Sequence, residues 1–185
     1  MKKMNSKGFT LIELLAVITI MGILMMVAIP SVSRTIENAR RDTFADIAHE
    51  YINAIRNNVL ADNIECNMGG ATPNWVVASG TPDGIYYFAI DTQSNNTKDL
   101  MESGGKSPFG NTEMTGYVVW TKQSTTNARG DYKTKVSYTM ALVDTGAHGF
   151  KTYKSEAEIK RNIIETANQT TADTPPSGAI QCQLS

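Results

Sequence analysis

The sequence has few residues of the kinds that build metal centres and catalytic sites. Its 185 residues include two cysteines and two histidines: Cys66, Cys182, His49 and His148. Structural zinc sites normally use four ligands, and these residues show no metal-ligand spacing. The motifs G-x-S-x-G and H-E-x-x-H, the phosphate loop and the EF-hand loop are also missing. The sequence therefore predicts no metal site, no cofactor and no enzymatic activity.

Charge is almost absent from residues 9–29. Seventeen of these 21 residues are apolar, and the exceptions are Thr10, Glu13, Thr19 and Gly22. As a helix the segment would be roughly 30 Å long, which matches the hydrocarbon core of a bilayer. A short segment with three lysines and no acid, Met1–Gly8, precedes it, and Pro30 follows it. The apolar run is longer than that of a secretory signal, and no convincing A-x-A site follows, so we expect a membrane span.

Glu13 is the one charged residue within this span. An acid in a membrane helix is costly and is therefore expected to have a partner. No basic residue lies within helical reach of it in the sequence. If the chain were cut between Gly8 and Phe9, the new α-amine of a neighbouring chain could meet Glu13. The alternative is that Glu13 stays protonated and alone.

The segment Lys7–Leu14, with the sequence KGFTLIEL, resembles the processing site of type IV pilins and of their relatives, the pseudopilins. The basic leader, the glycine before Phe9, the acid at Glu13 and the later Pro30 all fit this pattern. The resemblance implies cleavage after Gly8 by a prepilin peptidase and N-methylation of Phe9. It also implies subunit assembly through Phe9 and Glu13, in a filament with a core of packed apolar helices.

The same resemblance implies where the chain works and with which partners. It would be a single-pass prepilin in the inner membrane, with a cytoplasmic N-terminus, and later an extracellular pilus subunit for adhesion, motility or aggregation. Its partners would be other pilin copies, the prepilin peptidase/methyltransferase, and the pilus assembly platform and motor. Alternatives are a pseudopilin of a type II secretion or DNA-uptake machine, a minor pilin, or a membrane-anchored enzyme or receptor with an uncleaved helix.

Loss of the leader would also change the charge balance of the chain. It removes three of the 17 basic residues and none of the 18 acidic ones, which leaves a net charge of −4. Nucleic-acid binding generally needs a basic surface, so no specific nucleic-acid partner is predicted.

The pattern of the whole chain predicts an α+β fold, with a long N-terminal helix on an antiparallel sheet of three or four strands. After the leader (1–8) and the transmembrane, filament-core helix (9–30), a globular domain occupies 31–185. Its first part, 31–63, has apolar residues at helical spacing, and the glycine- and proline-rich 64–83 is expected to be a connecting loop. The rest, 84–185, is predicted to hold strands at 84–90, 115–122 and 132–144, and an irregular tail from 168. Short helices are predicted at 97–103 and 155–167, and the second begins with Ser-Glu-Ala-Glu, the pattern of a capping box.

Several smaller features have two interpretations each. A kink is expected at Pro30, which removes a helical hydrogen bond, and Gly22 is a second weak point in the same helix. The family resemblance implies that the stretch between them can loosen when subunits pack into a filament, and the alternative is a bent but intact helix. In an exported chain Cys66 and Cys182 could form a disulfide around more than a hundred residues, or they could remain reduced thiols. The tripeptide Arg129-Gly130-Asp131 matches an adhesion motif, and Asn95 and Asn168 begin glycosylation sequons. Ordinary turn and loop positions account for these three matches.

Overall fold

The computed structural model describes residues 9–69, 74–92, 100–101, 105–110 and 112–185. The contacts divide the chain into two compact units, one ending at Ala39 and the other comprising Arg40–Ser185. A single helix, α1 (Leu11–Leu60), contributes to both units. All described residues up to Arg40 have exposed side chains, so the hydrophobic core of the described chain lies in the second unit.

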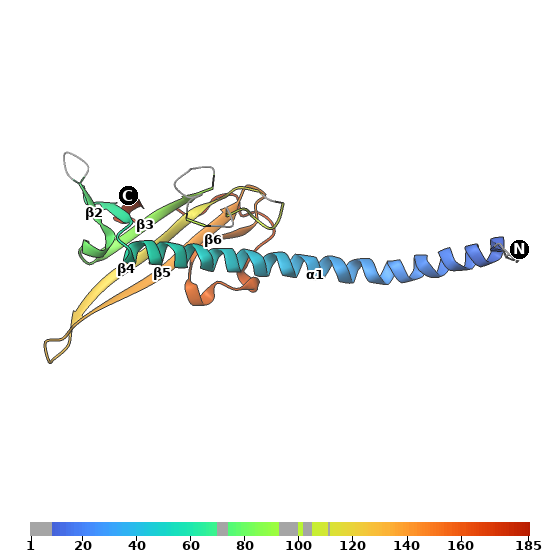
Figure 1. The fold of residues 1–185 in the computed structure, drawn as a ribbon, viewed down its shortest axis with the longest axis horizontal. Helices are drawn as coiled ribbons and strands as arrows, with labels where there is room; N and C mark the ends of the chain where they lie inside the picture. The colour runs from blue at the N-terminus through green and yellow to red at the C-terminus, as the bar shows by residue number, and fades with distance from the viewer. Residues whose placement is uncertain (1–8, 70–73, 93–99, 102–104, 111) are drawn as a thin grey trace, which may run out of the picture. The chain divides into compact units, whose positions relative to one another are not determined.

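In the second unit, the α1 segment from Arg40 to Leu60 packs on a β-sheet (Figure 1). Its buried side chains recur at steps of three and four residues, which places them along one helix face. They are Phe44, Ala45, Ala48, Tyr51, Ile52 and Ile55. Phe44 contacts the ring of Phe150 edge-on, with the centroids 6.3 Å apart. The apolar stripe predicted for the second half of the helix is therefore a core contact.

The sheet has seven strands in the order β2-β1-β7-β3-β4-β5-β6. The strands are β1 (Ile64–Asn67), β2 (Trp75–Val77), β3 (Gly84–Asp91), β4 (Met114–Thr126), β5 (Tyr132–Asp144), β6 (Gly149–Ser155) and β7 (Ile180–Leu184). All neighbouring strands are antiparallel except β3 and β7, which are parallel. The C-terminal strand β7 thus lies inside the sheet, where it joins the β1–β2 pair to the remaining strands.

The predicted α+β class is confirmed, but the predicted number of strands is wrong. The three expected strands are present as β3, β4 and β5, and four further strands join them. The segment 64–83, expected to be a loop, contains β1, β2 and a 3-10 turn at Ala78–Gly80. The tail, expected to be irregular, ends in β7. The strands β1, β2 and β7 have three to five residues each and β6 has seven, and pairing with neighbouring strands stabilises such short segments.

The helix predicted for 155–167 is also absent. In its place are two 3-10 turns, Glu156–Glu158 and Arg161–Ile163. The expected capping box does form, since the Ser155 and Glu158 side chains each bond to the backbone of the other residue. Ile159 and Ile164, which lie on either side of the second turn, have extended backbone and are both buried, so burial at these two positions does not require a helix. Most of the short helix predicted at 97–103 lies outside the described residues.

Candidate functional site

The first half of α1 exposes an unbroken apolar surface. Leu11, Ile23 and Val27, for example, are 84 %, 66 % and 75 % exposed. An 18-residue window of α1 reaches a mean hydropathy of 2.6, so by length and composition the helix could cross a membrane. Soluble monomers rarely expose apolar patches of this extent, and such a surface marks contact with lipid or with other protein. Lipid, other protein chains or both must therefore cover this half of the helix.

The start of the helix places Glu13 beside Thr10. The Glu13 Oε2 atom accepts hydrogen bonds from the Thr10 backbone N–H at 2.9 Å and from the Thr10 hydroxyl at 2.8 Å. In return, the Glu13 N–H donates to the Thr10 Oγ1 atom at 3.3 Å. This is a reciprocal capping box, in which Thr10 is the N-cap and Glu13 the third helical residue.

The capping box supplies an intrachain partner that the sequence analysis missed. From the sequence, a basic group was expected as the partner of Glu13, whereas Thr10 pairs with it through its hydroxyl and amide. The signal was available in the sequence, because Thr-x-x-Glu before an apolar run is typical of a helix start. A carboxylate is also favoured at this end of a helix by the helix dipole. The acid therefore helps to define where α1 begins.

The structure places the other predicted residues of this region as follows. Phe9 lies just before the capping box and is 85 % exposed, whereas Gly8 lies outside the described residues. Gly22 and Pro30 both lie within α1, which continues from Leu11 to Leu60 without interruption. A Cβ atom added at Gly22 would meet nothing within 4 Å, so packing within the chain does not require glycine there. A kink at these residues stays a prediction.

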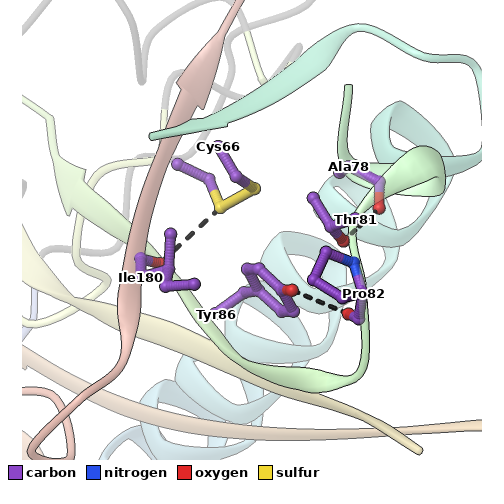
Figure 2. The surroundings of a disulfide bond; sticks show 7 residues. Cys66, Ala78, Thr81, Pro82, Tyr86 and Ile180 are labelled. Atoms are coloured by element: carbon purple, nitrogen blue, oxygen red, sulfur yellow. Dashed lines mark hydrogen bonds between the residues drawn. A yellow bond between two sulfur atoms is a disulfide. The ribbon is translucent and has the colours of Figure 1, made fainter. Parts of the chain in front are cut away.

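Cys66 and Cys182 form a disulfide between the neighbouring interior strands β1 and β7 (Figure 2). The two residues lie directly opposite each other in the antiparallel register, and both are buried. In Figure 2 the Tyr86 hydroxyl, close to the disulfide, donates to the Pro82 carbonyl at 2.7 Å. Because β1 follows the helix and β7 ends the chain, this bond links the two sequence extremes of the sheet.

The best-connected buried polar group is the carboxylate of Asp144, at the end of β5. It accepts hydrogen bonds from the Ser107 hydroxyl at 2.5 Å, the Thr112 hydroxyl at 3.1 Å and the His148 backbone N–H at 2.8 Å. The Nδ1 atom of His148 lies 2.9 Å from the same carboxylate. Burial raises the pKa of Asp144, but the hydrogen bonds from Ser107 and His148 outweigh it and hold the pKa below its usual value.

This cluster resembles a structural network more than a reactive site. Ser107 donates to Asp144 and not to the imidazole of His148, so these residues do not form the serine–histidine pair of a nucleophilic site. The His148 ring is also stacked on Phe109 with 4.4 Å between the centroids. Within the described parts of the chain, no three His, Cys, Asp or Glu residues lie together as a metal site would require. The cluster thus fastens the turn at Ser107–Phe109 to the end of β5.

The comparisons with known proteins identify the N-terminal segment alone. The family described as "Prokaryotic N-terminal methylation motif" matches residues 3–29, which include Phe9, Thr10 and Glu13. No curated protein and no solved structure matches the chain. The matched segment covers the predicted processing site, the capping box and most of the apolar helix surface described above. The chain therefore carries the N-terminal methylation motif of type IV pilins and pseudopilins, and with it the signal of a membrane-anchored precursor.

Proposed function

We propose that this chain is the structural subunit of a type IV pilus. It would be held in the inner membrane by α1, cleaved between Gly8 and Phe9, methylated at Phe9 and polymerised into a surface filament. The observation that carries the proposal is the methylation motif at residues 3–29, which coincides with an apolar helix surface left exposed in the single chain. Lipid would cover this surface before assembly, and neighbouring helices would cover it in the filament.

Cleavage would change the surroundings of Glu13. In the precursor, Thr10 already satisfies one carboxylate oxygen of Glu13. After cleavage a positive α-amine would appear at Phe9, one residue before the capping box. A carboxylate in an apolar filament core costs several kcal/mol unless a cation pairs with it, roughly the range measured for broken buried pairs. The amine of a neighbouring copy would provide that cation and would set the axial register between subunits.

Two substitutions at Glu13 separate pairing with the amine from helix capping. The Glu13→Gln variant retains an oxygen that can accept from Thr10 but loses the charge, whereas Glu13→Ala loses both. If the charge sets the register, both variants should be processed normally and both should form few filaments. Filament yield is measured by shearing cells and quantifying the released subunit. Normal filament yield with Glu13→Gln would show that capping suffices and would contradict the pairing.

The proposed function itself is tested by the N-terminus of the protein sheared from cells. Mass spectrometry should find a chain that starts at methylated Phe9 and lacks the three leader lysines. An intact leader on assembled material would exclude a pilin and would favour a membrane-tethered protein. A processed chain that stays in the membrane and is never released by shearing would instead favour a pseudopilin, since pseudopilins share the motif.

A further inference from the structure

The strands β4 and β5 continue as a two-stranded ribbon beyond the rest of the sheet (Figure 1). The strand β3 pairs with β4 only as far as Lys122, and β6 pairs with β5 only from Thr139 onward. Between these limits β4 and β5 pair only with each other, up to the turn at Asn127–Asp131. Every residue from Thr125 to Ser137 is exposed. We call residues 122–137 the basic ribbon, for the charge described next.

The basic ribbon has a charge opposite to that of the rest of the chain. It contains four bases and one acid, a net charge of +3: Lys122, Arg129, Asp131, Lys133 and Lys135. A chain cleaved after Gly8 would have a net charge of −4, so its remaining residues would carry −7. The side chains of Arg129, Lys133 and Lys135 make no hydrogen bond or ion pair with the described residues. Three cations are therefore available to a partner.

The opposite end of the same two strands is acidic. Asp91, the last residue of β3, pairs with Thr115 near the start of β4, and Glu113 immediately precedes β4. Within 91–113 the described residues carry these two acids and one base, Lys106. Asp91 is exposed, and one Glu113 oxygen accepts a hydrogen bond from Thr92. Glu113 and the start of the basic ribbon at Lys122 are nine residues apart along β4, which corresponds to roughly 30 Å of extended strand.

We propose that the basic ribbon of one copy docks against the acidic end, Asp91 and Glu113, of the next copy. This inference rests on the proposed function, because it requires a homopolymer. Packing copies that each carry −4 brings like charges together, and a contact between +3 and acidic surfaces offsets that repulsion. Since the two surfaces differ and lie at opposite ends of the strands, the contact is heterologous. Heterologous contacts can repeat without closing and thus suit a filament.

The composition of the ribbon also fits a protein interface. Tyr132 and Val136 are 71 % and 41 % exposed, and their side chains lie on one face of β5 while Lys133 and Lys135 lie on the other. Tyrosine and arginine are the residue types that contribute most at interface centres, and Arg129 is at the exposed turn. The five-residue turn is ordered by Asn127, whose Oδ1 accepts from the N–H groups of Arg129 and Asp131. An ordered turn lowers the entropy cost of docking.

Cysteine cross-linking in intact filaments tests the contact directly. A subunit with both Lys133→Cys and Asp91→Cys should produce a ladder of disulfide-linked oligomers on non-reducing gels of sheared filaments. Each single variant can link two copies at most and should produce no ladder. A matched pair, Lys160→Cys with Asp91→Cys, uses an exposed lysine outside the ribbon and should also produce none. Filaments that assemble normally from the first pair without a ladder would overturn the proposal.

Charge reversal tests whether the attraction matters for assembly. With Lys133→Glu and Lys135→Glu together we expect about tenfold fewer filaments, because two rim attractions become repulsions. Adding Asp91→Lys and Glu113→Lys should restore the yield, and Lys133→Arg with Lys135→Arg should leave it unchanged.

Unchanged filament yield in the variant with Lys133→Glu and Lys135→Glu would overturn the docking but not the pilus function. If that variant also no longer bound duplex DNA that the wild-type filaments bind, the basic ribbon would be assigned to binding a polyanion instead. Absence of methylated filaments in the wild type would reject the function itself.

Discussion

The two units of this chain differ in where they place their apolar side chains. In the first unit, up to Ala39, the described apolar residues are exposed, as at Leu24 and Ile29. In the second unit, the same helix buries Phe44, Ile52 and Ile55 against a sheet. One continuous helix can therefore serve two purposes. Where it packs within the chain, its stability is a property of the single molecule, and where it is bare, the surface needs a partner outside the chain.

The largest expected effect concerns the first unit and leaves the second folded. Gly8→Val should block cleavage, because the larger side chain precedes the scissile bond, and full-length precursor should accumulate. The mass of the chain, measured in membranes, reports this directly. Ser6→Ala, also in the leader, should be cleaved as usual. A shortened product from the Gly8→Val variant would place the cut at another bond.

In the second unit, the largest effect should come from the disulfide. Replacing both Cys66 and Cys182 with serine frees a loop that spans 116 residues in sequence, and the chain-entropy relation for a loop of about 100 residues predicts a loss of about 4–5 kcal/mol. The β1–β2 pair should detach first, since β7 is its connection to the sheet. Hydrogen exchange on the detergent-solubilised chain would report this order. Equal loss of protection in β4 and β5 would contradict it.

A matched pair of truncations compares the two halves of α1 themselves. Phe44→Ala should reduce the free energy of unfolding of the sheet unit by about 3–5 kcal/mol, since Phe44 is fully buried between Phe109 and Phe150. Ile18→Ala should change it by no more than about 0.5 kcal/mol, since Ile18 is 57 % exposed. Urea unfolding in micelles, followed by near-UV circular dichroism, measures both. Similar losses of unfolding free energy from Phe44→Ala and Ile18→Ala would mean that both halves of α1 contribute to the stability of the sheet unit.

The smallest expected effect is a pH dependence confined to the second unit. The pKa of Asp144 is below its usual value in the folded chain, so the unfolded chain binds the proton more readily. The contribution of this carboxylate to stability is therefore complete at neutral pH and declines as the pH falls below about 4, the ordinary aspartate pKa. Asp144→Asn should be less stable at pH 7 and should lose less stability between pH 5 and pH 3. An identical acid profile in both chains would exclude Asp144 as its source.

Sequence patterns predicted the features that depend on local physics. The helix, β3, β4 and β5 are long or strongly patterned, so local preference and tertiary structure agree there. The strand β7 was missed although its sequence, IQCQL, alternates apolar and polar residues as a strand does, because it has only five residues and follows a polar segment with two prolines. The capping box at Ser155 was correctly identified but was taken to start a full helix, since a cap does not specify the length of the helix it begins. The Thr10–Glu13 box was overlooked although the same rule would have found it.

The sequence by itself determined the membrane-length apolar helix, its single acid and the N-terminal methylation motif, because these properties belong to consecutive residues. Only the tertiary structure decided that the chain ends inside its own sheet, that Cys66 meets Cys182 across two strands, and that the basic ribbon and the acidic end lie at opposite ends of β4. Each of these depends on pairing between residues far apart in sequence. The free energy of such pairing comes from long-range contacts, which no local window contains.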